Sequence, residues 1–151
     1  MSPLTGRSAV ALFLAFAFAY FLSALLRAVT ATLAPMLGQE FHLQASDLGL
    51  LSGGYFLGFA AMQLPLGKWL DRHGPRKVQV GFLGVAALGC IVFAVSGGFS
   101  GLLMGRLLCG AGVSACLMAP LTGYRRWFTP TVQMRANAWM LMTGSLGMVA
   151  S

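Results

Sequence analysis

Long apolar runs constrain this chain more than any other feature of its sequence. They cover residues 9–37, 48–66, 78–95 and 102–124, and a fifth run begins near residue 136. A helix needs about 20 apolar residues to cross the hydrocarbon core of a bilayer. Only 9% of the residues are charged, against about 25% in soluble domains. The sequence therefore predicts an all-α protein, a polytopic bundle of transmembrane helices.

The runs also set the expected domain organisation. We expect four complete transmembrane helices and a truncated fifth, at about residues 9–37, 47–66, 77–96, 101–124 and 136–151. No segment has the composition of a soluble domain. Residues 1–151 are thus expected to be part of the transmembrane domain of a longer protein, or a truncated gene product.

The second helix carries its own start, stop and packing signals. Asp47 is a candidate N-cap, and Pro65 followed by Gly67 indicates the end of the helix. Small residues at four-residue spacing let helix backbones approach closely in a bilayer. Two such pairs predict tight packing of this helix: Gly49 with Gly53, and Gly54 with Gly58.

The basic residues predict the orientation of the chain. A cytoplasmic N-terminus places Arg7 and the loops 67–77 and 125–135 inside, whereas the connection between the first two helices carries Glu40 and Asp47. Lysine and arginine concentrate in the cytoplasmic loops of membrane proteins. We expect a multi-pass protein of a bacterial inner membrane, with its N-terminus in the cytoplasm and anionic lipid headgroups as neighbours. The net charge of +7 then reflects topology, and we expect no nucleic-acid partner.

The sequence contains no recognisable catalytic or metal-binding constellation. Its three acidic residues lie between the expected helices or at their ends, and it has no Ser/His/Asp arrangement, paired carboxylates or phosphate-binding glycine loop. The cysteines have neither C-x-x-C spacing nor a companion histidine, so we interpret all three as buried apolar side chains: Cys90, Cys109 and Cys116. The sequence predicts neither an enzyme nor a protein that holds a metal or a cofactor.

A cluster of charge interrupts the apolar sequence between the second and third helices. The segment 67–77, GKWLDRHGPRK, holds four basic residues and one acid. Anchoring on the cytoplasmic side explains the bases, but it does not explain the acid or the glycines. The segment resembles G-x-x-x-D-R-x-G-x-R-R, a loop motif that the major facilitator superfamily places between its second and third helices. The matching positions are Gly67, Asp71, Arg72, Gly74, Arg76 and Lys77.

A second match lies near the start of the fourth helix. Arg106, Gly110 and Gly112 resemble the R-x-x-x-G-x-G motif of the same superfamily. The resemblance implies two six-helix halves with a substrate site between them, and transport by rocking of one half against the other. This chain would be most of the first half, and the missing C-terminal half would be its partner. Three interpretations of Arg106 remain open: coupling, packing of the helix, or simple reach to water at the external end.

By the same resemblance, Asp71 belongs to a cytoplasmic gate. In the family, this carboxylate meets the positive end of a helix in the second half and pairs with neighbouring basic side chains. A helix N-terminus attracts an anion by about 0.3–1 kcal/mol. The basic and glycine positions of the motif would complete the charge network and allow the close approach.

Arg27 is the most informative residue of the first helix. A charge within a transmembrane run costs at least about 2.5–3.5 kcal/mol on insertion scales, so such residues usually face a cavity or a partner. A polar stripe on one helical face predicts a wall of a water-filled cavity and a substrate site: Tyr20, Ser23, Arg27 and Thr30. Three interpretations of Arg27 remain open: substrate contact, structural pairing, and snorkelling to the external interface.

Arg27 and Pro35 also resemble the first helix of two anion-handling branches of the superfamily. In the organophosphate/phosphate antiporters and the anion:cation symporters, this arginine contacts a phosphate or a carboxylate, which its planar fork suits. Many of the symporters have an acid just before the arginine for proton coupling, whereas Leu26 stands here. A coupling proton or ion would therefore need another residue. Tyr55 and Gln63, in the second helix, are expected to form interhelical hydrogen bonds.

Together these features predict a secondary active transporter that moves a small organic or inorganic anion by alternating access. One alternative is a drug or sugar porter of the same superfamily in which Arg27 is structural. The other is a free-standing small membrane protein that assembles into an oligomer and has no transport activity of its own.

Overall fold

The computed structural model describes residues 7–150, which form six α-helices. They are α1 (Arg7–Glu40), α2 (Ala45–His73), α3 (Pro75–Ala94), α4 (Phe99–Val113), α5 (Ala115–Trp127) and α6 (Pro130–Val149). Residues 7–150 contain no strand, so the prediction of an all-α fold is confirmed. Among the described residues, three stretches are long and apolar enough to cross a membrane: Arg7–Glu40, Pro75–Ala94 and Phe99–Trp127, the last comprising α4 and α5.

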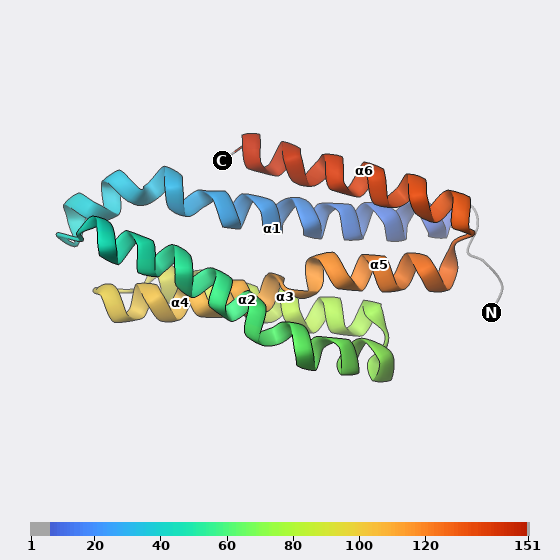
Figure 1. Ribbon diagram of the computed structural model, residues 1–151, viewed down its shortest axis with the longest axis horizontal. Coiled ribbons are helices and arrows are strands. Elements are labelled where there is room, and N and C mark those ends of the chain that lie inside the picture. Colours follow the sequence, from blue (N-terminus) through green and yellow to red (C-terminus); the bar gives the residue numbers. More distant parts are fainter. Residues whose placement is uncertain (1–6, 151) are drawn as a thin grey trace.

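The chain reverses direction at four of its connections, which gives the bundle two distinct ends. At one end α1 begins, α2 meets α3, and α5 meets α6 (Figure 1, right). We call it the motif end because the junction of α2 and α3 lies there. At the other end, which we call the turn end, α1 meets α2 and α3 meets α4.

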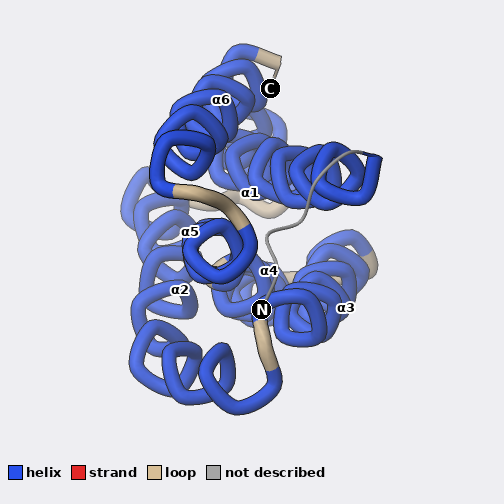
Figure 2. Tube along the Cα trace, turned by 90° about the vertical axis from the view of Figure 1, so that its right-hand side faces the viewer, coloured by secondary structure: helices blue, strands red, loops and turns tan. Residues whose placement is uncertain are grey.

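The helices α4 and α5 occupy the centre of the bundle. Figure 2 looks along the helices and shows α4 and α5 between α2 and α3, with α1 and α6 side by side above them. The most extensive contacts join α3 to α4, α2 to α4, and α1 to α6. At the motif end a core of large side chains, including Phe16, Leu66, Tyr124 and Met140, connects these pairs.

Glycines bring α4 into backbone contact with both of its neighbours. A Cβ atom on Gly110 would collide with the carbonyl oxygen of Tyr55 in α2, and one on Gly112 would collide with the backbone of Ala86 in α3. Gly58 in α2 lies equally close to the backbone of α4. Both glycines of the fourth-helix motif therefore act in helix packing, where small residues permit close approach.

The predicted packing role of the α2 glycines is confirmed for only one of the two pairs. A Cβ on Gly54 would lie 2.7 Å from the side chain of Leu103, and Gly58 lies against α4 as described. Gly49 and Gly53 have nothing within 4 Å of such an atom. Spacing alone did not distinguish these two faces of the helix, because both pairs share the same four-residue interval.

The ends of α2 differ from the prediction. The helix continues through Pro65 and Gly67 to His73. Pro65 removes only one hydrogen bond, and the surrounding bundle holds the helix together beyond it. At the start, Gln44 is the N-cap, and Asp47 instead occupies the third helical position, where its carboxylate accepts from the Gln44 N–H over 2.9 Å.

Two further boundaries differ from those expected. The fourth predicted helix is divided at Ser114, whose hydroxyl donates to the Ala111 carbonyl over 2.7 Å. Such a bond, together with the backbone bond from Ser114 N to the same carbonyl, tightens the turn and interrupts the regular ladder. The basic loop expected at residues 125–135 is reduced to Phe128 and Thr129, because α5 continues to Trp127 and α6 begins at Pro130.

We expect Gly110→Ala to destabilise the protein by about 1–3 kcal/mol, the usual cost of overpacking. The added methyl group would force α4 away from the Tyr55 carbonyl. Thermal unfolding of the purified protein in detergent measures the effect. Gly53→Ala is the matched control, and it should be neutral or stabilising because its Cβ meets open space and alanine favours helix by roughly 0.5–1 kcal/mol. Equal unfolding temperatures for Gly110→Ala and the unmodified protein would contradict the packing role.

Candidate functional site

The polar residues of α1 contact two different helices, α2 and α6. Ser23 and Thr30 are buried, with 2% and 5% of their surfaces exposed, and Arg27 is partly buried. Tyr20 belongs to a different contact, because its ring packs against Gly144 of α6. Tyr20 thus contacts α6, whereas Ser23 contacts Tyr55 of α2.

Tyr55 of α2 contacts the polar residues of α1 around Arg27. Its hydroxyl donates to the carbonyl oxygen of Ser23 over 3.4 Å and lies next to the Arg27 side chain. The expected interhelical hydrogen bond of Tyr55 is thus confirmed. Gln63, for which the same was expected, has an amide nitrogen that is buried without a hydrogen-bond partner within residues 7–150.

Arg106 lies in the interior of the bundle, next to the ring of Tyr55. Only 2% of its surface is exposed, so the interpretation that it reaches water is wrong. Its Nη1 donates to the carbonyl oxygen of Leu26 over 3.0 Å. Its guanidinium carbon also lies 5.7 Å from the centre of the Tyr55 ring and 5.3 Å from that of Phe93. Such cation–π contacts contribute about 0.5–2 kcal/mol each, so Arg106 holds α1, α2 and α3 to α4.

The two arginines give this region an uncompensated positive charge. Within residues 7–150 neither Arg27 nor Arg106 forms an ion pair, and Glu40 and Asp71, both exposed, lie at opposite ends of the bundle. The Nε atom of Arg27 is buried without a hydrogen-bond partner in the described chain, as are Nε and Nη2 of Arg106. We call Arg27, Tyr55 and Arg106 the arginine cluster. Its free donors and charge suit an anion.

The motif residues 67–77 form a helix end and the start of the next helix, instead of the loop that was expected. Asp71 lies in the last turn of α2, and Gly74 alone separates α2 from α3. Gly74 has φ of 80°, a backbone conformation that glycine adopts readily. Pro75 then begins α3, where its fixed φ suits the first helical position.

The side chains of this motif are mostly free to meet other parts of a protein. Asp71, Arg72, Arg76 and Lys77 are exposed, and the Asp71 carboxylate has no ion pair or hydrogen bond within residues 7–150. The guanidinium group of Arg126 lies over Gly74, 3.9 Å from the position of a Cβ atom. The sequence placed Arg126 on the same side of the membrane as the motif, but only the tertiary structure brings it next to Gly74.

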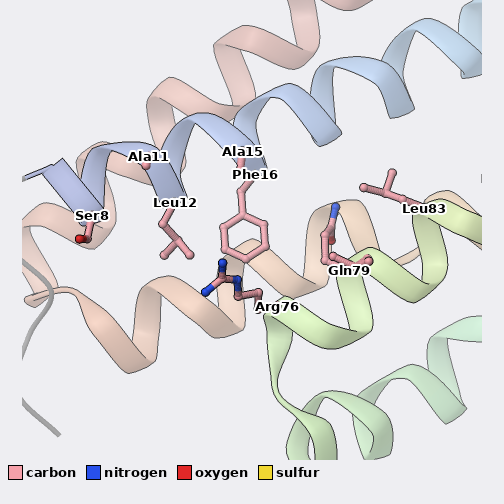
Figure 3. Close-up of a pocket in the computed structure, with 9 residues that line it drawn as sticks. Ser8, Ala11, Leu12, Ala15, Phe16, Arg76, Gln79 and Leu83 are labelled. Atoms are coloured by element: carbon pink, nitrogen blue, oxygen red, sulfur yellow. The ribbon is translucent and has the colours of Figure 1, made fainter.

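A cavity of about 430 Å³ lies between α1 and α3 at the motif end. In Figure 3, Leu12 and Phe16 point into it from α1, and Arg76 and Gln79 approach from α3. Gln79 is buried and donates to the Cys116 sulfur over 3.4 Å. None of the predicted substrate residues lines this cavity, so it is separate from the arginine cluster.

Known proteins resemble this chain over most of its length. The family model of the Major Facilitator Superfamily matches residues 16–151. The nitrate/nitrite transporter NrtP of Picosynechococcus sp. is 32% identical over 117 residues, which are 75% of this chain and 21% of NrtP. The inner membrane transport protein YajR of Escherichia coli is 38% identical over 80 residues, 52% of this chain and 18% of YajR.

The probable sulfoacetate transporter SauU of Cupriavidus necator is 27% identical over 109 residues, 72% of this chain and 25% of SauU. The chain therefore spans about a fifth to a quarter of the length of these relatives. Because the family model matches nearly the whole sequence, and because an all-α bundle carries both motifs where the family has them, the chain belongs to the major facilitator superfamily.

Proposed function

We propose that this chain is part of a secondary transporter that moves a small organic or inorganic anion across a membrane. The observation that carries the proposal is the arginine cluster, which holds two guanidinium groups in the bundle with no acid beside them. Transport would follow the alternating access that the superfamily fold supports.

The energetics of the cluster favour an anionic ligand. Each arginine within a membrane span costs at least about 2.5–3.5 kcal/mol on insertion scales. For Arg106 the Leu26 carbonyl and two aromatic rings offset part of this cost. Arg27 lies next to the Tyr55 hydroxyl, and its buried Nε lacks a hydrogen-bond partner in the described chain. A planar or tetrahedral anion that accepts from the Arg27 fork would supply the missing hydrogen bonds.

Two of the relatives support this ligand class. NrtP is named for nitrate and nitrite, and SauU for sulfoacetate. Nitrate, nitrite and sulfoacetate are small anions whose oxygen atoms accept hydrogen bonds from a guanidinium group. We therefore propose Arg27 as the direct contact of the anion, with Tyr55, Ser23 and Thr30 in the surrounding wall and Arg106 against the Tyr55 ring.

We propose that the motif end faces the cytoplasm of a bacterial cell. Arg7, Lys68 and Arg125 lie at this end together with the basic residues of the motif, whereas Glu40 and Asp47 lie at the turn end. This distribution agrees with the enrichment of lysine and arginine in cytoplasmic segments. The basic groups would contact anionic lipid headgroups there.

We further propose that Asp71 acts as one side of a cytoplasmic gate. An acid in the last turn of a helix is disfavoured by the negative end of the helix dipole, at a cost of about 0.3–1 kcal/mol. Asp71 is exposed and unpaired within residues 7–150, and Gly67 presents open space one turn earlier. Both features fit a carboxylate that meets the N-terminus of a helix elsewhere in the transporter. A coupling ion of the transporter would bind a residue other than Leu26.

We expect Arg27→Ala in the full-length transporter to reduce nitrate uptake at least about thirtyfold. Removing one partner of a buried charged hydrogen bond costs about 2–5 kcal/mol. Uptake of labelled nitrate into cells, repeated with small sulfonates and carboxylates as competitors, measures the effect. Arg27→Lys should recover only part of the uptake, because it keeps the charge but loses the planar fork.

The matched control for this test is Arg7→Ala, which removes an exposed charge at the start of the same helix. It should leave uptake unchanged, and membrane fractions should contain both variants in normal amounts. Normal uptake of every anion by correctly inserted Arg27→Ala would overturn the assignment of an anionic substrate.

Asp71→Asn should lower the maximal uptake rate by up to about fivefold, the factor that corresponds to 1 kcal/mol at the gate. The affinity for the anion should change little, because Asp71 lies at the motif end, away from the arginine cluster. Rates and binding constants measured separately on the full-length protein distinguish the two effects. Glu40→Gln at the turn end is the control. A change confined to affinity would argue against a gate.

The proposed orientation has a direct test in intact cells. With the native cysteines replaced by serine, Lys68→Cys should react with a membrane-impermeant maleimide only in inverted vesicles, since we place the motif end in the cytoplasm. Glu40→Cys should react only in intact cells. The opposite labelling pattern would reverse the orientation.

A further inference from the structure

Cys90 of α3 and Cys109 of α4 face each other across the contact between these helices. Their sulfur atoms lie 3.7 Å apart. Cys109 is buried, with 2% of its surface exposed, whereas Cys90 is partly exposed. The third cysteine, Cys116, is bonded by Gln79 and takes no part in this pair.

The helix contact at this point holds the two thiols in place. A Cβ atom on Gly89, next to Cys90, would lie 2.6 Å from the backbone nitrogen of Cys109 and 3.0 Å from the carbonyl oxygen of Gly105. The backbones of α3 and α4 therefore touch directly beside the cysteine pair. Because close-packed interiors leave little room for sliding, the sulfur atoms stay near one another. Rotation of the two side chains would then shorten the sulfur–sulfur distance from 3.7 Å to the roughly 2.05 Å of a disulfide bond.

A cation lies beside the pair. Arg106 precedes Cys109 by one helical turn, and its guanidinium group is close enough to interact electrostatically with both thiols. Its Nε and Nη2 atoms have no hydrogen-bond partner within residues 7–150. The positive charge of Arg106 stabilises the negative charge that develops on a reacting thiol sulfur. The pair thus combines a partly accessible thiol, a buried second thiol and a positive charge.

We propose that Cys90 and Cys109 form a reversible disulfide in response to hydrogen peroxide, linking α3 to α4. The Cys90 thiolate attacks one peroxide oxygen, the O–O bond breaks, and the departing hydroxide takes a proton to become water. Cys90 is then a sulfenic acid. Cys109 attacks its sulfur and displaces the hydroxyl group as a second water. Two thiols and one peroxide give one disulfide and two water molecules, so the sulfur atoms are oxidised and the peroxide oxygens reduced.

The disulfide would lie beside the arginine cluster. Arg106, one turn from Cys109, holds the carbonyl of Leu26, the residue before Arg27. Formation of the bond would move the Cys109 side chain, which lies beside Arg106, and would displace the guanidinium group from its position in the arginine cluster. Oxidation should therefore reduce anion uptake and a thiol reductant should restore it. This consequence rests on the proposed function, whereas the disulfide itself does not.

The test counts free thiols in the purified full-length protein before and after hydrogen peroxide. Treated protein is unfolded and labelled with a maleimide polymer that shifts its mobility on a gel. We expect two fewer labelled thiols per chain, recovery on reduction, and a monomer on a non-reducing gel. Peptide mass spectrometry should identify a bond between Cys90 and Cys109. Loss of no thiol, or a bond that includes Cys116, would overturn the proposal.

Matched variants locate the chemistry. Cys116→Ser should still lose two thiols, whereas Cys90→Ser and Cys109→Ser should form no intramolecular disulfide. Arg106→Met should slow oxidation several-fold and Arg106→Lys should oxidise nearly as fast as the unmodified protein, because lysine keeps the charge. If Arg106→Met fails to fold, the comparison among the cysteine variants still decides whether the disulfide forms.

Uptake measured in parallel separates the two proposals. Peroxide should lower nitrate uptake by the unmodified transporter and leave uptake by Cys109→Ser unaffected. A disulfide without any change in uptake would overturn its coupling to the arginine cluster. Absence of uptake of nitrate, small sulfonates and carboxylates alike in the untreated protein would instead count against the proposed function, with the thiol count unaffected.

Discussion

The buried guanidinium group of Arg106 is the interaction on which the interior of this bundle depends. From α4 it donates to the Leu26 carbonyl of α1 and contacts the rings of Tyr55 in α2 and Phe93 in α3. A charge in this position is costly unless partners surround it, so it favours one arrangement of four helices over others. The glycines of α4 make the arrangement possible, because they let α2 and α3 approach to backbone contact.

The same packing explains how two kinds of polar residue remain separate. The arginine cluster lies inside the bundle, where positive charge has no acidic partner within residues 7–150. The charged side chains of the motif are exposed at the motif end, where water and headgroups can solvate them. In the proposed transporter the first group would bind the anion and the second would control access to it. Helix α2 connects the two groups, because it carries Tyr55 of the cluster and Asp71 of the motif.

Sequence reasoning was most successful where the physical signal is local. Long apolar runs predicted the all-α fold, and two short motifs indicated the superfamily. Helix ends were predicted less well. Pro65 did not end α2, because tertiary contacts beyond it outweigh one lost hydrogen bond. Ser114 divided the fourth predicted helix through a side-chain bond that hydrophobicity does not reveal.

The sequence by itself determined which segments are helical, where their charge lies and which family motifs they carry, since these depend on neighbouring residues and on transfer from water to lipid. Only the tertiary structure decided which side chains meet. It joined Arg106 to Leu26, Tyr55 to Ser23 and Cys90 to Cys109. It also placed the Tyr20 ring against Gly144 of α6. These contacts depend on the register between helices, which is set by the fit of many small residues along the whole interface.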